Sequence, residues 1–207
     1  MGDLILVIAG LSRNFGEHEV VRQLDLDLRR GERIALWGPN GSGKTTVLRC
    51  ITGTLLPTAG QIHVDGHRAG SIEARTRTGA SLAQERSFYL RLSGLENLLF
   101  FARTRGLTKR QAARRVAALE DELQLSEFLG ERLDRCSTGM IQQLAFARAL
   151  IGDPDLLLLD EPTRSLDEAA RARFWSALDA RPRSALLIAT HLESDLRHCG
   201  GRVDLPS

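Results

Sequence analysis

A glycine-rich loop at residues 38–46 (GPNGSGKTT) constrains the fold of this 207-residue chain more than any other segment. Its spacing, G-x-x-x-x-G-K-[ST], is typical of a loop that holds nucleotide phosphates. Such a loop needs a strand before it and a helix after it, and the sequence predicts a strand at residues 33–37 and a helix at residues 45–52. Of the 28 basic residues 26 are Arg, so Lys44 is one of only two lysines. We therefore favour a nucleoside triphosphate site over a glycine turn that merely caps an ordinary helix.

Each residue type in this loop has a physical reason for its place. Glycines let backbone N–H groups approach phosphate oxygens without a Cβ in the way, and the N-terminus of the following helix favours negative charge. Lys44 is expected to reach the β- and γ-phosphates, Thr45 to place its hydroxyl on Mg²⁺, and Thr46 to add a phosphate contact. The predicted nucleotide-binding residues of the loop are Gly38, Pro39, Asn40, Gly41, Ser42, Gly43, Lys44, Thr45 and Thr46.

Two carboxylates follow a second apolar strand, which is predicted at residues 156–159. Asp160 is placed to hold Mg²⁺, directly or through water, and Glu161 is placed to polarise an attacking water as a general base. Taken alone, the segment LLLLDE is equally compatible with an acidic residue that caps the next turn. The glycine loop upstream favours the catalytic interpretation.

Composition limits the classes of protein that fit. A hydrophobic content of 43% suits one α/β domain over residues 1–207. A net charge of +2 is too small to indicate a surface that binds nucleic acid. Three widely spaced cysteines predict reduced thiols in a cytosolic protein rather than disulfides or a zinc site. The apolar run at residues 4–9 is too short for a signal peptide, and no run approaches the roughly 18 apolar residues that span a bilayer. Any role at a membrane is therefore expected to come through a partner.

The remaining pattern predicts an α/β core that is interrupted by helices. Strands are expected at residues 4–9, 24–28, 62–64, 79–83 and 184–189, the last being the final clear strand, and residues 90–135 are expected to form an inserted helical subdomain. Ser93 with Glu96, and Thr108 with Gln111, have the spacing of capping boxes. The apolar faces of these helices are predicted to consist of Leu95, Leu98, Leu99 and Ala102, and then of Val116, Leu119 and Leu123.

Further segments resemble motifs of the nucleotide-binding subunits of ABC (ATP-binding cassette) transporters. They occur in the order that is usual for that family, and the resemblance covers nearly the whole chain. Residues 160–163 (DEPT) and 165–167 (SLD) resemble that family's Walker B motif and D-loop. Residues 136–140 (CSTGM) stand where the family's LSGGQ signature belongs. Gln84 is similar to the Q-loop glutamine, His191 to the switch histidine, and Phe15 to the aromatic residue that stacks on adenine.

The resemblance implies a fold and a set of roles. The fold would be the P-loop NTPase core of ABC ATPases, an α/β structure with a mixed sheet around the P-loop helix and an inserted α-helical subdomain. Gln84 would join Mg²⁺ and the attacking water to that subdomain, and His191 would contact the γ-phosphate. Ser137 and Gly139 would contact the γ-phosphate held by the opposite subunit, and Asp167 of the D-loop would belong to the same composite site.

The resemblance also implies partners. A head-to-tail homodimer would close on two ATP molecules with Mg²⁺ and drive export through a separate integral-membrane permease. The subunit would then be cytoplasmic and peripheral on the inner face of the cell membrane. Phe88, Tyr89, Phe100 and Phe101 would line the groove that receives the permease, unless they form the core of the helical subdomain instead.

The signature departs from LSGGQ, because Cys136, Thr138 and Met140 replace Leu, Gly and Gln. Signatures of the form S-x-G-M resemble those of the type-2 exporter branch, which exports drugs, lipids or polysaccharides, and heme export is a minor option. Two other classes stay open: a soluble ABC ATPase that acts on DNA or ribosomes, and a regulatory ATPase that signals across a membrane. The substrate itself is not predicted, because its specificity is expected to lie in the membrane subunit.

Overall fold

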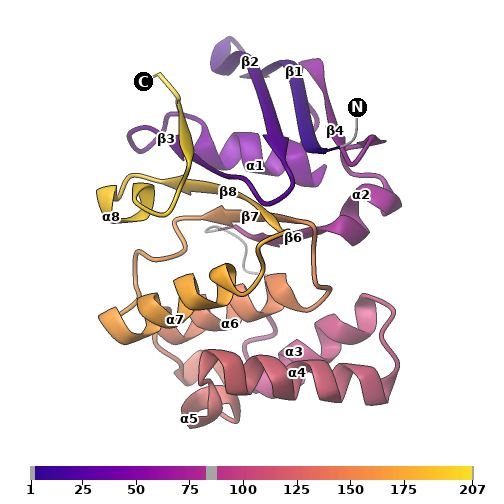
Figure 1. The fold of residues 1–207 in the computed structure, drawn as a ribbon, viewed down its shortest axis with the longest axis vertical. Helices are drawn as coiled ribbons and strands as arrows, with labels where there is room; N and C mark the ends of the chain where they lie inside the picture. The colour runs from indigo at the N-terminus through magenta and orange to yellow at the C-terminus, as the bar shows by residue number, and fades with distance from the viewer. Residues whose placement is uncertain (1–2, 83–87, 207) are drawn as a thin grey trace.

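The computed structural model describes residues 3–82 and 88–206, which form two sheets with a helix between them (Figure 1). The first sheet is antiparallel and has the order β2-β1-β4-β5. Its strands are β1 (Leu4–Phe15), β2 (His18–Arg29), β4 (Ala59–Val64) and β5 (His67–Arg68). Helix α1 (Lys44–Thr52) contacts β2 and β4 on one side and β7 and β8 of the second sheet on the other.

The second sheet is parallel and has the order β6-β7-β8-β3-β9. Its strands are β3 (Arg33–Trp37), β6 (Thr78–Ser81), β7 (Leu156–Asp160), β8 (Ala185–Thr190) and β9 (Gly201–Asp204). The expectation that residues 184–189 hold the final strand is wrong, because β9 pairs with β3 beyond it. An α/β fold with a mixed set of strands around the loop's helix is confirmed.

The register of the parallel sheet places the carboxyl ends of its central strands at one edge of the sheet. Trp37 pairs with Thr190, and Asp160 pairs with Ala189, so β3, β7 and β8 all end at the same level. In parallel sheets, ligands bind beyond these carboxyl ends. The loops that follow the three strands begin at Gly38, Glu161 and His191, which are the residues that the sequence singled out.

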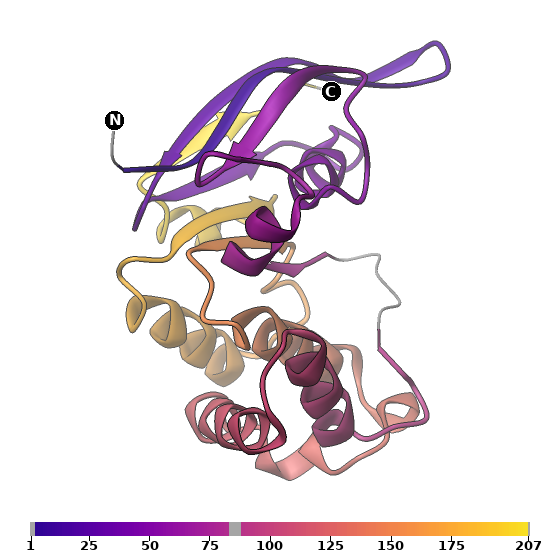
Figure 2. The same cartoon turned by 90° about the vertical axis from the view of Figure 1, so that its right-hand side faces the viewer.

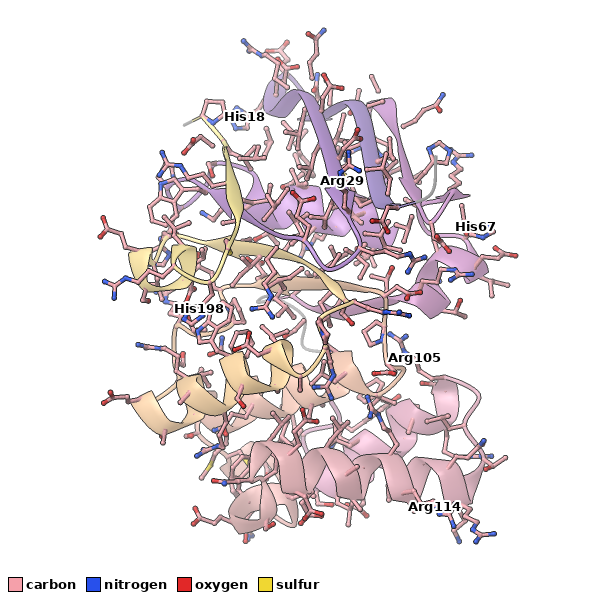
Figure 3. All side chains as sticks on the ribbon, in the orientation of Figure 1. His18, Arg29, His67, Arg105, Arg114 and His198 are labelled. Atoms are coloured by element: carbon pink, nitrogen blue, oxygen red, sulfur yellow. The ribbon has the colours of Figure 1, made fainter. Side chains whose placement is uncertain are left out.

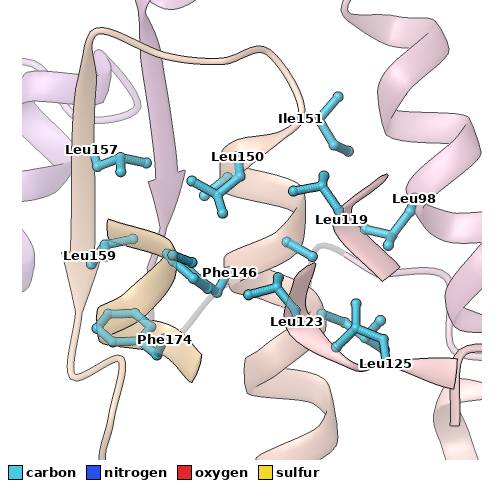
Figure 4. Packing of buried hydrophobic residues seen from close by; sticks show 14 of the residues in the cluster. Leu98, Leu119, Leu123, Leu125, Phe146, Leu150, Ile151, Leu157, Leu159 and Phe174 are labelled. Atoms are coloured by element: carbon cyan, nitrogen blue, oxygen red, sulfur yellow. The ribbon is translucent and has the colours of Figure 1, made fainter. Parts of the chain in front are cut away.

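Strand β7 is buried on both of its faces, as is typical of a covered parallel strand. Its residues Leu156 and Leu158 belong to the hydrophobic cluster around α1 and the first sheet. Leu157 and Leu159 belong to the second cluster, which continues into the helices (Figure 4). The strand therefore contributes one face to each of the two hydrophobic cores.

The helices lie together on the far side of the parallel sheet (Figure 2). They are α3 (Gly94–Thr104), α4 (Lys109–Leu123), α5 (Ser126–Leu129), the 3₁₀ turn η1 (Leu133–Arg135), α6 (Thr138–Leu150) and α7 (Glu168–Asp179). Both predicted capping boxes are present, at Ser93 and at Thr108. Leu95 was wrongly placed on an apolar face: it is 39% exposed, because it lies in the first turn of α3 away from the cluster that buries Leu98.

Two short helices and α7 were not predicted from the sequence. Helix α2 (Ile72–Arg77) precedes β6, and α8 (Glu193–Leu196) follows β8. Each is shorter than two full turns, so its apolar periodicity is too brief to recognise. Helix α7 is longer. Its N-cap is Asp167, whose carboxylate accepts from the N–H of Ala170 at 2.7 Å.

Arginines join the helices to the rest of the molecule. Arg115 of α4 donates to the carbonyl oxygens of Leu150 (2.5 Å) and Ile151 (3.1 Å) at the end of α6. Arg105, which lies where the helices meet the parallel sheet (Figure 3), donates to the carbonyl of Thr78 at 2.8 Å. These two side chains therefore make structural contacts.

A closed set of four ion pairs joins the turns of the first sheet to the strands of the second. Arg30 contacts Asp65 at 2.7 Å and Asp155 at 2.8 Å. Arg77 contacts the same two carboxylates at 2.8 and 3.3 Å. All four side chains are half-buried, so we call this set the Arg30–Arg77 network.

Candidate functional site

The loop at residues 38–46 connects β3 to α1 and closes around its own lysine. Lys44 is 6% exposed, and its Nζ donates to the carbonyl oxygens of Gly38 (2.6 Å) and Pro39 (2.9 Å). Gly43 has φ +92°, and a Cβ added there would lie 2.8 Å from the carbonyl oxygen of Val20. The loop thus needs glycine at this position both for its conformation and for its space.

The loop offers polar groups that suit a phosphate. The hydroxyl of Ser42 is buried without a hydrogen-bond partner among the described residues, and such a group is costly unless a ligand supplies one. Lys44 stands at the N-terminus of α1, where the helix dipole favours negative charge. Pro39, Asn40 and Gly41 are exposed at the tip of the loop. The residues present therefore fit a bound phosphate group.

Thr45 and Asp160 meet, although 115 positions separate them in the sequence. The hydroxyl of Thr45 donates to Oδ2 of Asp160 at 2.7 Å, and Asp160 is 4% exposed. A hydroxyl beside a carboxylate is the oxygen set that Mg²⁺ accepts when it is bound mainly through substrate phosphates and water. Within the described ranges, His, Cys, Asp and Glu side chains form no cluster of three that could hold a metal ion by themselves. The pair therefore fits Mg²⁺ that arrives with a nucleotide.

Glu161 and His191, which the sequence also predicted as site residues, contact each other. Nδ1 of His191 lies 2.7 Å from Oε1 of Glu161. The other carboxylate oxygen, Oε2, is buried and makes no hydrogen bond within the described part of the chain. Glu161 also has φ +49°, a region that residues other than glycine seldom occupy and that costs roughly 1–3 kcal/mol. A strained acidic residue with one unpaired buried oxygen is a candidate proton acceptor.

The predicted signature begins helix α6. Ser137 is its N-cap and accepts from the N–H of Met140 at 3.2 Å, while the N–H of Ser137 donates to the Met140 sulfur at 3.4 Å. A Cβ added to Gly139 would lie 2.6 Å from the carbonyl oxygen of Ser165, so the helix start packs directly against the segment that leads to Asp167. Ser137, Gly139 and Asp167 thus lie on neighbouring segments, as a shared role requires.

Two residues that hold this region together were missed by the sequence analysis. Asp195 of α8 is fully buried and accepts from the hydroxyls of Thr163 (2.8 and 3.0 Å) and Thr190 (2.7 Å), the residues beside Glu161 and His191. Gln142 of α6 hydrogen-bonds the backbone on both sides of the same loop. Gln142 belongs to the run of residues that continues the predicted signature, but nothing in the sequence marks the remote backbone partners that it contacts, and Asp195 stands in no recognisable local pattern.

Burial of Cys199 beside this cluster raises the pKa of its thiol to about 11, with a smaller contribution from Asp195. The thiol donates to the backbone carbonyl of Asp195 at 3.6 Å. A thiol with this pKa stays neutral at physiological pH, so Cys199 behaves as a packing residue.

The last predicted residues fall at the margins of the site. Phe15 ends β1 and is 48% exposed, with the Arg13 guanidinium 4.6 Å from its ring centroid. Stacking of Phe15 on adenine stays a prediction, and Gln84 lies outside the described residues. His67 stands on the edge strand β5, and His198 stacks on Trp175 with ring centroids 3.9 Å apart; both histidines are labelled in Figure 3.

Comparison with known proteins agrees with this geometry. The family model described as ABC transporter matches residues 21–164. The Nod factor export ATP-binding protein I of Cupriavidus metallidurans is 37% identical over 94% of this chain and 66% of its own length. An sn-glycerol-3-phosphate import ATP-binding protein of Rhizobium johnstonii is 37% identical over 79% of this chain and 44% of its own length. The chain therefore spans two thirds or less of these relatives.

A solved structure described as the ATP-binding subunit of an ABC transporter superposes with a TM-score of 0.87 at 28% identity, over 97% of this chain and 85% of the other. The matched family segment contains the glycine loop, the signature and the Asp160–Glu161 pair. On this family match and these relatives, the chain belongs to the ABC transporter ATP-binding proteins.

Proposed function

We propose that this protein hydrolyses ATP in the presence of Mg²⁺, and that hydrolysis drives export through a separate integral-membrane subunit. The carboxylate of Glu161 carries the proposal. One of its oxygens is held by His191 at 2.7 Å, and the other is buried and has no hydrogen-bond partner among residues 3–82 and 88–206, at the edge of the sheet where Thr45 and Asp160 meet.

The proposed roles follow from the positions of the side chains. Lys44 and the backbone N–H groups of its loop hold the phosphates. Oε2 of Glu161 accepts a proton from the attacking water, and His191 keeps the carboxylate oriented through Oε1. Mg²⁺, bound at Thr45 and Asp160, would neutralise developing charge on the phosphates. Catalysis at such a site consists mainly of positioning and charge stabilisation.

Ser137, Gly139 and Asp167 are assigned to the nucleotide of a second copy of the chain. Ser137 is exposed at the N-terminus of α6, and a capped helix start with exposed N–H groups is an anion site. Each subunit of a head-to-tail dimer would then offer its glycine loop to one ATP and its signature to the other.

The membrane subunit is assigned to a groove of about 780 Å³ between the parallel sheet and the helices. Its lining includes Ile72, which is 78% exposed, and Arg75, Phe101 and Arg105. An occupant with acidic and apolar side chains, such as a short cytoplasmic helix of a permease, suits this lining. Of the aromatics expected there, Phe101 lines the groove, and both Phe101 and Phe88 pack against the helical cluster.

Every helix in residues 3–82 and 88–206 is too short or too polar to cross a bilayer. A first test is therefore a pull-down of tagged protein from detergent-solubilised membranes of the host, followed by mass spectrometry. A stoichiometric polytopic membrane protein is expected. Recovery of ribosomes, DNA or soluble proteins alone would contradict the transport role and favour a soluble ATPase.

The chemistry is tested by Glu161→Gln, which preserves the shape of the side chain and removes its basicity. We expect ATP affinity within about twofold of the wild type and a turnover roughly 100-fold lower, since general base catalysis contributes about that much. Glu168→Gln, an exposed glutamate at the start of α7, is the matched control. Hydrolysis by Glu161→Gln at the wild-type rate would overturn the assignment of the base.

A further inference from the structure

The side-chain amide of Gln142 brackets the segment that follows β7. Its Nε2 donates to the carbonyl oxygen of Glu161 at 2.5 Å, and its Oε1 accepts from the N–H of Ser165 at 3.2 Å. One contact needs a donor and the other an acceptor, so the two backbone partners fix the orientation of the amide. The bracket spans the four peptide units between Glu161 and Ser165.

This pair of contacts acts on a residue whose backbone conformation needs support. Glu161 has φ +49°, and a residue outside the common conformations persists only where its surroundings hold it there. Its N–H donates to the carbonyl of Ala189 at 2.8 Å, which ties the peptide before its Cα to β8. Gln142 ties the peptide after its Cα to α6. Together the two contacts set the direction in which the carboxylate leaves the backbone.

The bracket also joins Glu161 to the start of α6. Gln142 lies five positions after the N-cap Ser137, on the same rigid helix. Gly139, between them, approaches Ser165 so closely that an added Cβ would lie 2.6 Å from its carbonyl oxygen. A shift of the helix start is therefore passed to both ends of the bracketed segment.

We propose that Gln142 is a positioning residue that sets the orientation of the Glu161 carboxylate according to the position of helix α6. This inference rests on the proposed role of Glu161 as the base. Because the start of α6 is assigned to the nucleotide of the opposite copy, Gln142 links the occupancy of one composite site to the geometry of the catalytic base in the other.

The test uses the purified full chain and two variants of similar size. Gln142→Leu removes both hydrogen bonds, while Gln142→Glu still accepts from Ser165 and places an acidic oxygen beside the Glu161 carbonyl. We expect kcat to fall roughly 30- to 100-fold in both, with the Kd for ATP within about twofold of the wild type, because a small misplacement of a reacting group costs that much. Gln143→Leu, the adjacent half-buried glutamine on the same helix, is the matched control and should retain wild-type kcat.

A second readout separates positioning from damage to the helix. In the Glu161→Gln background, Gln142→Leu should leave ATP-dependent dimer formation, measured by light scattering, within about twofold, and should lower the residual kcat no further. Multiplicative loss of kcat or failure to dimerise would overturn the inference. Wild-type kcat in both Gln142 variants would overturn it as well, while leaving the proposed function intact. Absence of ATP hydrolysis by the wild type would instead count against the proposed function.

Discussion

The loop after β3 and the loop after β7 lie at the same edge of the sheet but are held in different ways. The first is stabilised by its own residues: Lys44 donates to the carbonyl oxygens of Gly38 and Pro39, six and five positions away. The second is held by side chains from distant elements, namely Gln142 of α6 and Asp195 of α8. The phosphate loop is therefore encoded locally, whereas the loop of the proposed catalytic base depends on how α6 and α8 are docked.

This difference separates two kinds of function. A loop closed by its own hydrogen bonds depends less on the docking of other elements, which suits a site that must retain a ligand. A loop held by other elements changes when they move, which suits a site whose activity must depend on assembly. Substitutions in the two loops should therefore differ in which property they change.

The largest expected effect in the phosphate loop is on ATP binding. Lys44→Ala should weaken ATP affinity roughly 100-fold, because a charged donor to phosphate is worth about 1.5–3 kcal/mol. Titration with a fluorescent ATP analogue measures it. Lys109→Ala, at the other lysine of the chain, is the control and should bind ATP as the wild type does. Equal affinity in both variants would contradict the role of Lys44.

The largest effect on stability is expected in the loop after β7. Asp195→Ala leaves the hydroxyls of Thr163 and Thr190 without their acceptor, so the free energy of unfolding should fall by roughly 2–4 kcal/mol. Asp195→Asn keeps one acceptor oxygen and should lose about half as much. Urea denaturation followed by circular dichroism measures both. A loss below about 0.5 kcal/mol in the alanine variant would mean that the cluster does not hold the loop.

Glycine substitutions test whether the phosphate loop is closed by its own geometry. Gly43 has φ +92°, and the Cβ added by Gly43→Ala would lie 2.8 Å from the Val20 carbonyl oxygen. This substitution should therefore lower the free energy of unfolding by roughly 2–3 kcal/mol. Gly41→Ala has φ +89° and open space, so about 1 kcal/mol is expected. Thermal unfolding of the two variants measures the difference. Equal losses would show that close packing against β2 adds nothing.

The smallest effect concerns the Arg30–Arg77 network, which lies away from both loops. Asp65→Asn keeps a residue that tolerates φ +49° and removes the charge that both arginines contact, so about 1 kcal/mol of stability should be lost. The loss should shrink in 1 M salt, because the pairs are half-exposed and become screened. Stability measured at low and high salt checks this, and a loss independent of salt would point to packing instead.

The sequence predicted the contiguous features of the molecule and missed those whose partners are remote. The strand, loop and helix around Lys44 were predicted because their residues adjoin one another. The roles of Gln142 and Asp195 were not, since these residues bond partners 19 and 32 positions away, which no local pattern indicates. Strand β9 was missed because only Val203 of its four residues is even partly buried, so no apolar alternation marks it.

The position of β7 between two hydrophobic cores has a consequence for folding. Its alternate leucines belong to both clusters, so neither half of the molecule can lose its core without exposing one face of the same five-residue strand. Amide hydrogen exchange in β7 should therefore proceed only through global unfolding, and the slowest-exchanging amides of both halves should share one opening free energy. The strand that ends at the proposed metal and base residues would then also be the element that makes the chain unfold as a single cooperative unit.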